Sequence, residues 1–178
     1  MQCADVFYLK ADICQLGLDQ RKVNMLARDY CPNPIKPIIL SHHMLLGLKE
    51  GQTKQSKSDP MSAIFMEDSE KDVIKKINKG FCPEKVVEEN PIMDMAKFIV
   101  FPAYDDEFTL EIRKDDKKII KTYKSYQEFE ADYITGEIHP SDLKPAVASA
   151  INRLLQPVRE HFQNDPFAKN LLETIKKW

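Results

Sequence analysis

The sequence lacks several features that would point to particular classes of protein. Its four cysteines never form a Cys-x-x-Cys pair, so a structural zinc site is not expected. No apolar run is long enough to cross a bilayer, and Lys10 and Asp12 interrupt the apolar stretch nearest the start, where a signal peptide would lie. We therefore expect a cytoplasmic protein with reduced thiols, no protein-bound metal and no membrane partner.

An excess of one charge is also missing. The 26 Lys and Arg residues and 28 Asp and Glu residues leave a formal net charge of −2, which gives no whole-chain basic field for nucleic acid. Residues 113–124 are the exception, because six of them are cationic and only Asp115 and Asp116 are acidic. Such a patch can bind phosphate, but a solvated hairpin would have the same composition.

The composition is otherwise that of a soluble globular protein. Hydrophobic residues make up 43% of the chain and charged residues 30%, which is enough apolar material to bury a core. The length of 178 residues fits one large domain or two small ones. The chain opens directly on core-like residues, 1–7, without a polar lead-in, so we expect it to be part of a longer protein.

The first part of the chain predicts two helical segments followed by one strand. Residues 1–9 suit a short helix or turn, and apolar residues recur at helical spacing over 20–30, with Asp19 as a plausible N-cap. The apolar run 37–40 suits a buried parallel strand. A helix followed by such a strand is typical of a doubly wound α/β sheet.

The rest of the chain predicts one long loop, several helices and a hairpin. Residues 41–66 show no periodicity, and their centre, 49–60, is a polar loop of the kind that is usually functional or disordered. Alternating apolar residues over 108–112 can pair with 119–123 as a β-hairpin. Side chains suited to capping helices stand before the apolar stretches of helical spacing: Ser69, Asn90, Ser125, Asp142 and Asp165. The predicted fold is mixed α/β followed by mainly α, with a small β-hairpin.

Three polar clusters could carry chemistry, although each also has an ordinary structural explanation. Gln2 and Asp5 would share one face of a helix, and Gly17 precedes a polar pair where backbone could approach a ligand. Residues 54–58, Lys-Gln-Ser-Lys-Ser, suit a polyphosphate, yet a solvated loop would look the same. Residues 139–142 taken alone are a plain capping sequence.

Together these segments resemble the class I aminoacyl-tRNA synthetases, and specifically the tyrosyl-tRNA synthetases of the eukaryotic and archaeal cytosolic type. Residues 54–58 are similar to the family's Lys-Met-Ser-Lys-Ser loop, and residues 17–22, Gly-Leu-Asp-Gln-Arg-Lys, to its Gly-x-Asp-Gln-Arg-Lys segment. Residues 41–45, 62–66 and 139–144 look like the cytosolic branch. These motifs follow the family's order over nearly the whole chain.

The resemblance implies a fold and a reaction. Residues 1–66 would be the C-terminal part of a Rossmann-like catalytic domain that includes the loop, and residues 67–178 an α-helical anticodon-binding domain. The family's enzymes are tyrosine–tRNA ligases, which activate tyrosine with ATP, accompanied by Mg²⁺, and then transfer it from tyrosyl-adenylate to tRNA(Tyr). The implied partners are tyrosine, ATP, tRNA(Tyr) and, in the full-length enzyme, a second copy in a homodimer.

The resemblance also implies roles for residues near the reacting groups. Gln2 and Gln20 match residues that bind the amino group and backbone of tyrosine, and Asp5 matches the carboxylate that accepts the proton of its hydroxyl. Lys54 and Lys57 match the catalytic lysines that stabilise pyrophosphate. Four further residues match the ATP and adenylate site: Gly17, Asp19, Ser56 and Ser58.

The anticodon would be read elsewhere in the chain. His139, Pro140 and Asp142 match the helix start that receives the first anticodon base. A carboxylate at this place suits the N–H donors of a guanine edge. Lys117 stands where the family commonly has an aromatic residue, and Lys118–Ile120 where it has Gly-Gly-Asn, which weakens the case for anticodon contacts on the hairpin.

Two departures bear on activity. Gln55 replaces the methionine of the family's loop, which predicts looser packing of that loop without loss of its chemistry. The family's His-x-Gly-His motif lies upstream and has no match here, so we expect this chain to be inactive alone. An alternative is a non-catalytic tRNA-binding module or pseudo-subunit. A tryptophanyl relative is disfavoured because Asp5 suits a phenol and not an indole.

Overall fold

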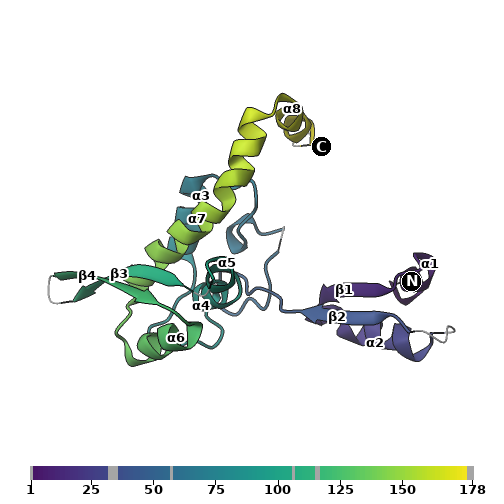
Figure 1. Ribbon diagram of the computed structural model, residues 1–178, viewed down its shortest axis with the longest axis horizontal. Helices are drawn as coiled ribbons and strands as arrows, with labels where there is room; N and C mark the ends of the chain where they lie inside the picture. Colours follow the sequence, from purple (N-terminus) through teal and green to yellow (C-terminus); the bar gives the residue numbers. More distant parts are fainter. Residues whose placement is uncertain (1, 32–35, 57, 106, 115–116, 176–178) are drawn as a thin grey trace. The chain divides into compact units, whose positions relative to one another are not determined.

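The structure is a computed structural model that describes residues 2–31, 36–56, 58–105, 107–114 and 117–175. The chain divides into two compact units, Met1–Met44 (unit 1) and Leu45–Trp178 (unit 2), and each is described by itself. Figure 1 labels their helices and strands. The division between the compact units falls within the segment predicted as the catalytic part, so residues 45–66 pack with unit 2. The assignment of two functional domains stays a prediction.

Unit 1 alternates helix and strand, with the two helices and the second strand near their predicted places and a first strand, β1, that was not predicted. Helix α1 covers Gln2–Tyr8, strand β1 Ile13–Gly17, helix α2 Arg21–Asp29 and strand β2 Ile38–His42. The two strands pair in parallel, from Ile13 opposite Ile38 to Gly17 opposite His42. Because parallel strands need a long crossover, α2 serves as the connection between them (Figure 1).

Two details of unit 1 differ from the predictions. The strand at 38–42 is not buried within this unit, since Ile38 is 53% exposed and Leu40 49% exposed. A two-stranded sheet with few covering elements cannot bury both faces, whatever the composition of its strands. Asp19 is not the N-cap of α2, because Leu18–Gln20 form a 3-10 turn and Gln20 occupies the cap position.

Unit 2 is mainly helical. Its helices are α3 (Glu70–Lys79), α4 (Pro91–Met95), α5 (Phe101–Ala103), α6 (Tyr126–Thr135), α7 (Pro140–Asn164) and α8 (Pro166–Ile175), with a 3-10 turn at Pro60–Ser62 and a π-helical turn at Ala96–Val100. Strands β3 (Phe108–Lys114) and β4 (Lys117–Tyr123) form the predicted antiparallel hairpin. The expected mixed α/β, largely helical composition is confirmed.

The core of unit 2 lies between α7, the hairpin and the helices that pack on them. Side chains of β3 alternate between buried and exposed, with Phe108, Leu110 and Ile112 facing inward. Phe129 of α6 lies at the centre of an aromatic cluster, with ring centroids 5.4 Å from Phe101 and 5.6 Å from Phe108. Such edge and tilted packing is favourable between aromatic rings, so this cluster fixes the hairpin against α6.

Local capping predictions are largely confirmed. Ser69 Oγ accepts the backbone N–H of Asp72 at 3.2 Å, and Ser125 Oγ that of Glu128 at 3.3 Å. Asn90 caps α4 through Ile92 and Met93.

The prediction that Asp142 caps α7 is wrong, because His139 occupies that position. Asp142 lies in the first turn, where its carboxylate accepts a hydrogen bond from another element.

Candidate functional site

Unit 1 brings together two of the three residues predicted to bind tyrosine. The side-chain amide of Gln2 on α1 donates a hydrogen bond to the amide oxygen of Gln20 at 2.7 Å. This contact joins α1 to the start of α2 across 18 residues of sequence. Asp5 lies one turn after Gln2 on the same short helix and is exposed. Because residues three apart on a helix are neighbours, Gln2 and Asp5 lie on the same face of α1, as predicted.

The side chains of Met44 and Asp19 pack closely against Gly17. A Cβ atom there would lie 2.1 Å from Met44 Sδ and 2.8 Å from Asp19 Oδ1. The Gly17 backbone has φ of −62°, which any residue adopts, so a larger residue here would require the side chains of Met44 and Asp19 to move. The predicted adenylate residues Gly17 and Asp19 are therefore adjacent at the end of β1.

The predicted phosphate-binding loop lies in unit 2. Lys54 is exposed, and the hydroxyls of Ser56 and Ser58 are 2.8 Å apart. Ser62 Oγ donates to the backbone carbonyls of Asp59 at 2.8 Å and Ser56 at 3.3 Å, which ties the loop to the 3-10 turn after it. Lys57, the second predicted catalytic lysine, lies outside the described residues.

An ion pair closes the neck of this loop. Lys49 Nζ pairs with the carboxylate of Asp59, and this hydrogen bond holds the pKa of Asp59 below its usual value. The backbone N–H of Gln55 donates to the carbonyl of Leu45 at 3.2 Å. These contacts fix the loop to the rest of unit 2, and the polar composition of the loop does not predict them.

Gln55 faces apolar surroundings. It lines a hollow of about 330 Å³ in unit 2 whose other walls are apolar: Leu45, Ile64, Phe65, Met66, Met95, Ile99, Ile151, Leu154 and Leu155. An amide in such a place contributes less to packing than an apolar side chain of similar size. This observation agrees with the predicted looser packing of the loop.

The residues predicted to bind the anticodon lie together at the start of α7. The backbone N–H of Ser141 donates to His139 Nδ1 at 3.1 Å, and His139 Nε2 lies 2.6 Å from Glu84 Oε1. Because Nδ1 accepts, this pattern assigns the proton to Nε2, which donates to Glu84. Pro140 takes the first helical position, where a missing N–H is tolerated. The imidazole is therefore held from both sides.

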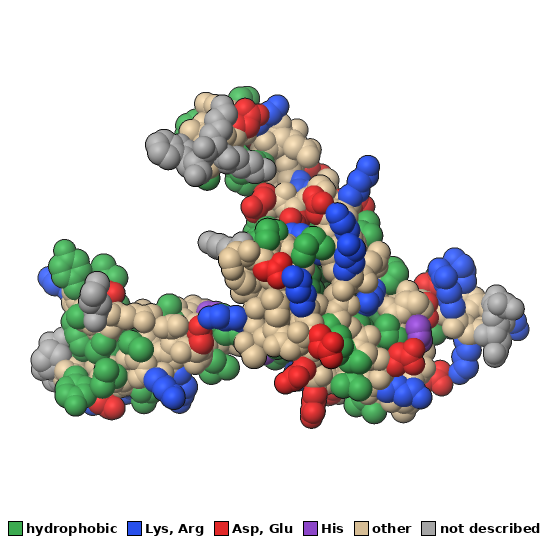
Figure 2. Space-filling model, turned by 180° about the vertical axis from the view of Figure 1, so that it is seen from behind, with side chains coloured by type: hydrophobic (Ala, Val, Ile, Leu, Met, Phe, Trp, Pro, Cys, Tyr) green, Lys and Arg blue, Asp and Glu red, His purple; other side chains and the backbone are tan. Residues whose placement is uncertain are grey.

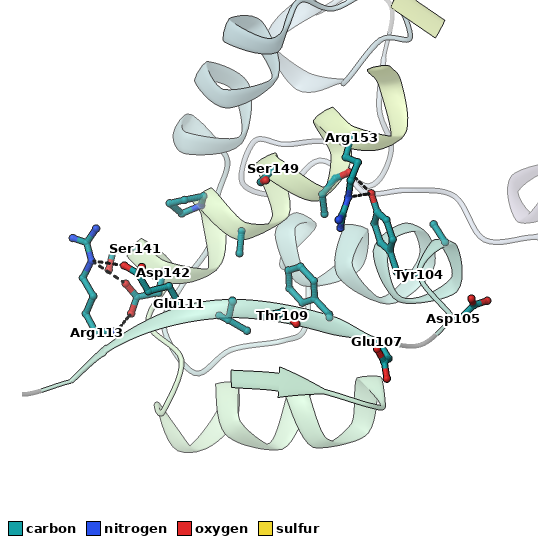
Figure 3. Close-up of a pocket in the computed structure, with 16 residues that line it drawn as sticks. Tyr104, Asp105, Glu107, Thr109, Glu111, Arg113, Ser141, Asp142, Ser149 and Arg153 are labelled. Atoms are coloured by element: carbon teal, nitrogen blue, oxygen red, sulfur yellow. Dashed lines mark hydrogen bonds and ion pairs between the residues drawn. The ribbon is translucent and has the colours of Figure 1, made fainter. Parts of the chain in front are cut away.

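Asp142 is buried and faces the hairpin. Its Oδ2 accepts the backbone N–H of Arg113 on β3 at 3.2 Å, and its Oδ1 is 4.0 Å from Arg113 Nε. Asp142 also lines a hollow of about 760 Å³ between β3 and α7, called here the β3–α7 groove, which extends along α7 to Arg153. Figure 3 shows Asp142 and Arg113 at one end of this groove and Arg153 with Tyr104 at the other.

The far end of the groove is formed by a cation–π pair. The guanidinium carbon of Arg153 lies 4.2 Å from the centroid of the Tyr104 ring. Arg153 Nε donates to the hydroxyl of Tyr104 at 2.9 Å, and that hydroxyl donates to the carbonyl of Ala150 at 2.9 Å. No short sequence pattern points to these residues, because they are 49 positions apart, with Tyr104 just after α5 and Arg153 on α7.

The basic segment at 113–124 forms the hairpin that Figure 2 shows with lysine and arginine side chains along it, at the right of the view. Its cations are largely paired: Lys114 with Glu137 at 2.9 Å, Lys118 with Glu111 at 2.9 Å, and Lys121 with Asp132. Asp115 and Asp116 lie outside the described residues. These pairs favour the solvated-hairpin explanation over a free phosphate-binding patch.

No three His, Cys, Asp or Glu side chains among the described residues are grouped so that they could hold a metal ion. No helix in the described part of the chain combines the length and apolar character needed to cross a membrane.

Comparisons with known proteins agree on one family. The family described as tRNA synthetases class I (W and Y) matches residues 1–156. The chain is 58% identical over 181 residues to tyrosine–tRNA ligase 1, cytoplasmic, of Arabidopsis thaliana, covering all of this chain and 46% of the plant protein. It is 40% identical to a tyrosine–tRNA ligase of Saccharolobus islandicus, covering 99% of this chain and 54% of that protein.

A solved structure gives the same result. The tyrosyl-tRNA synthetase of Leishmania major in complex with tyrosinol superimposes with a TM-score of 0.87 at 45% identity, covering 99% of this chain and 35% of that one. The chain thus spans about half, or less, of the length of these similar proteins.

Proposed function

The chain belongs to the class I tRNA synthetases for tryptophan and tyrosine, on the tyrosyl side of that family, and on this premise we propose that it is part of a tyrosine–tRNA ligase. The whole enzyme would use ATP to convert tyrosine to tyrosyl-adenylate and release pyrophosphate. It would then transfer the tyrosyl group to the 3′ end of tRNA(Tyr). The name of the Arabidopsis relative supports a cytoplasmic location for this protein too.

In the proposed amino-acid site, unit 1 supplies the residues that recognise tyrosine. The Gln2–Gln20 pair, held at 2.7 Å, would bind the amino group and backbone of the substrate. Asp5 would accept the hydrogen bond of the phenol hydroxyl. A site that pairs this hydroxyl penalises phenylalanine, because its polar group would be left without a partner. Asp19 and Gly17 would lie against the adenylate.

In the proposed phosphate site, the loop at 54–58 supplies charge. Lys54 and Lys57 would neutralise the negative charge that develops on the leaving pyrophosphate as the tyrosine carboxylate attacks ATP. Ser56 and Ser58 would donate hydroxyl hydrogen bonds to the phosphates. Mg²⁺, where it accompanies ATP, would be held through the phosphates. We further propose that this chain does not activate tyrosine alone, since the family's upstream histidine motif has no match in it.

Unit 2 would bind the anticodon. Residues 67–178 would form the anticodon-binding domain, which follows the Rossmann-like part in the sequence. The observation that carries this proposal is the grouping of His139, Pro140 and Asp142 at the start of α7, with the buried Asp142 carboxylate lining the β3–α7 groove. A carboxylate accepts hydrogen bonds from the N–H groups of a guanine edge. The full-length enzyme is proposed to be a homodimer, as the family resemblance implies.

The experiment that tests this proposal compares two RNAs. Fluorescence anisotropy would measure binding of the 178-residue chain to the anticodon stem–loop of tRNA(Tyr) with guanine or adenine as the first anticodon base. Loss of one good base contact costs about 1–3 kcal/mol, so we expect guanine to be preferred by roughly five- to a hundredfold. Asp142→Asn should remove the preference. Equal affinities for the two RNAs in the unmutated chain would contradict the proposal.

A further inference from the structure

The far end of the β3–α7 groove carries a pair of side chains that the proposed anticodon contact does not use. We propose that Tyr104 and Arg153 form a second nucleotide-binding site, in which the guanidinium of Arg153 stacks an unpaired base of the same RNA strand. This inference rests on the proposed function, because it assumes that one base of the strand lies at Asp142. Figure 3 shows the two ends of the groove.

The geometry of the pair suits a stacking platform. Arg153 lies on the Tyr104 ring with its guanidinium carbon 4.2 Å from the ring centroid, and Arg153 Nε donates to the Tyr104 hydroxyl at 2.9 Å. The hydroxyl is itself fixed by the Ala150 carbonyl. The guanidinium is therefore held in one orientation before any ligand binds, and an ordered planar cation of this kind stacks well on a base.

The remaining surface of Arg153 is accessible. The residue is exposed, and it lines both the β3–α7 groove and a second hollow of about 400 Å³ between α3 and α7. Tyr104 holds the Nε edge of the guanidinium, and because Arg153 is exposed, the rest of the group is left for a base. Stacking of this type tolerates any base, so the site would add affinity without reading sequence.

The charge of the groove favours bases over phosphates inside it. Asp105, Glu107 and Glu111 line the groove together with Asp142, against two cations, Arg113 and Arg153. This excess of carboxylates repels phosphate, and carboxylate oxygens accept hydrogen bonds from base N–H groups. The strand would therefore lie with its bases toward the groove and its phosphates toward solvent.

The distance between the two ends fits a short single strand. Asp142 and Arg153 are eleven residues apart on α7, which at about 1.5 Å per residue is roughly 16 Å along the helix. Stacked nucleotides of one strand rise about 3.4 Å each, so roughly five of them span this distance, and fewer do so where the strand is extended. The groove volume of about 760 Å³ leaves room for more than one base.

The test separates the shape of the side chain from its charge. Arg153→Lys keeps the positive charge and removes the plane, so it should weaken binding of the anticodon stem–loop to the 178-residue chain by roughly five- to a hundredfold. The slope of log affinity against log salt should not change, because no phosphate contact is lost. Lys169→Ala, which removes an exposed cation of α8, is the control and should alter affinity by less than about twofold.

A second readout identifies the base that stacks. Stem–loops carrying 2-aminopurine at single loop positions should show quenching at one position beyond the first anticodon base. Arg153→Lys should abolish that quenching, and Asp142→Asn should leave it in place under saturating protein. Full affinity and unchanged quenching in Arg153→Lys would overturn the platform.

The outcomes also separate this inference from the proposed function. If the unmutated chain showed no preference for guanine, the proposed anticodon contact at Asp142 would be contradicted. The second site would then lose the contact on which it is argued. A guanine preference with full affinity in Arg153→Lys would overturn the platform alone. Binding of an arginine-rich peptide that competes with the RNA and is lost in Glu107→Gln would show that the groove takes cationic peptides, and would also overturn it.

Discussion

The buried carboxylate of Asp142 accepts the backbone N–H of Arg113 over 3.2 Å, which joins the first turn of α7 to strand β3 across 29 residues of sequence. One carboxylate oxygen is thereby occupied by the protein, and the side chain is fixed at the end of the β3–α7 groove. The contact also explains why Asp142 does not cap its own helix. Its contributions to stability and to RNA binding can therefore be separated by substitution.

Asp142→Asn should leave stability close to that of the unmutated chain, because the amide oxygen can still accept the Arg113 N–H. Asp142→Ala should lower the free energy of unfolding by about 1 kcal/mol, since the backbone N–H of Arg113 loses its partner. Urea denaturation measures both. Equal destabilisation by the two substitutions would show that the hydrogen bond to Arg113 does not contribute to stability.

His139 should stabilise the start of α7 as its N-cap. His139→Ala should cost about 1 kcal/mol in the free energy of unfolding, whereas His139→Asn should retain most of it, because asparagine is a good capping residue. Glu84→Gln tests the other side of the imidazole and should leave the cap intact, since Nδ1 still accepts from Ser141. If Glu84→Gln lowered the free energy of unfolding as much as His139→Ala does, this arrangement would be contradicted.

These two residues show what the sequence could and could not predict. The caps at Ser69, Asn90 and Ser125 were predictable because a capping side chain bonds to N–H groups two or three residues away. The hairpin was predictable because its alternation is local too. The cap at His139 is local as well, since it bonds to the N–H of Ser141, but the contacts of Asp142 with Arg113 and of His139 with Glu84 span 29 and 55 residues, and no local pattern contains them.

The same limit applies to the rest of the candidate site. The contact between Tyr104 and Arg153 joins residues 49 positions apart, so the sequence near either residue does not predict it. The exposure of Ile38 and Leu40 depends on which elements cover the sheet, whereas their composition shows only that they suit a strand. The resemblance to a family supplied the candidate roles of Gln2, Asp5 and Lys54, which composition alone would have left as ordinary polar residues.

Asp132 should make stability depend on pH in the acid range. Burial works against its ionisation, but hydrogen bonds from Lys121 and Tyr123 outweigh this and hold the pKa of Asp132 below its usual value of 3.8. A lowered carboxyl pKa stabilises the folded state above pH of about 3.8 and loses this effect as the pH falls through the folded value. Asp132→Asn should therefore be less stable at pH 7, and the difference should shrink below about pH 4.

Urea denaturation at several pH values checks this prediction. Asp29→Asn in unit 1 is the control, because Asp29 is exposed and lies outside the hairpin. A stability difference between Asp132→Asn and the unmutated chain that stays constant from pH 7 to pH 3 would contradict the assignment.

Gln55→Met should tighten the loop. The apolar hollow beside Gln55 would be better filled, and cavity filling typically raises the free energy of unfolding by about 0.5–2 kcal/mol. Gln163→Met on the exposed surface of α7 is the control and should change stability by less than about 0.5 kcal/mol. Equal effects of the two substitutions would show that the hollow does not limit the packing of the loop.

We propose above that this chain supplies part of the catalytic machinery of a tyrosine–tRNA ligase. The most direct measurement replaces the matching segment of a plant relative with this chain and follows tyrosine-dependent exchange of pyrophosphate into ATP. The chimera should catalyse exchange, and the isolated chain should not. Lys54→Ala in the chimera should lower the exchange rate tenfold or more, which corresponds to a loss of about 1.4 kcal/mol or more in transition-state stabilisation. A folded chimera that binds the anticodon stem–loop but shows no exchange would contradict the claim and identify the chain as a non-catalytic tRNA-binding module.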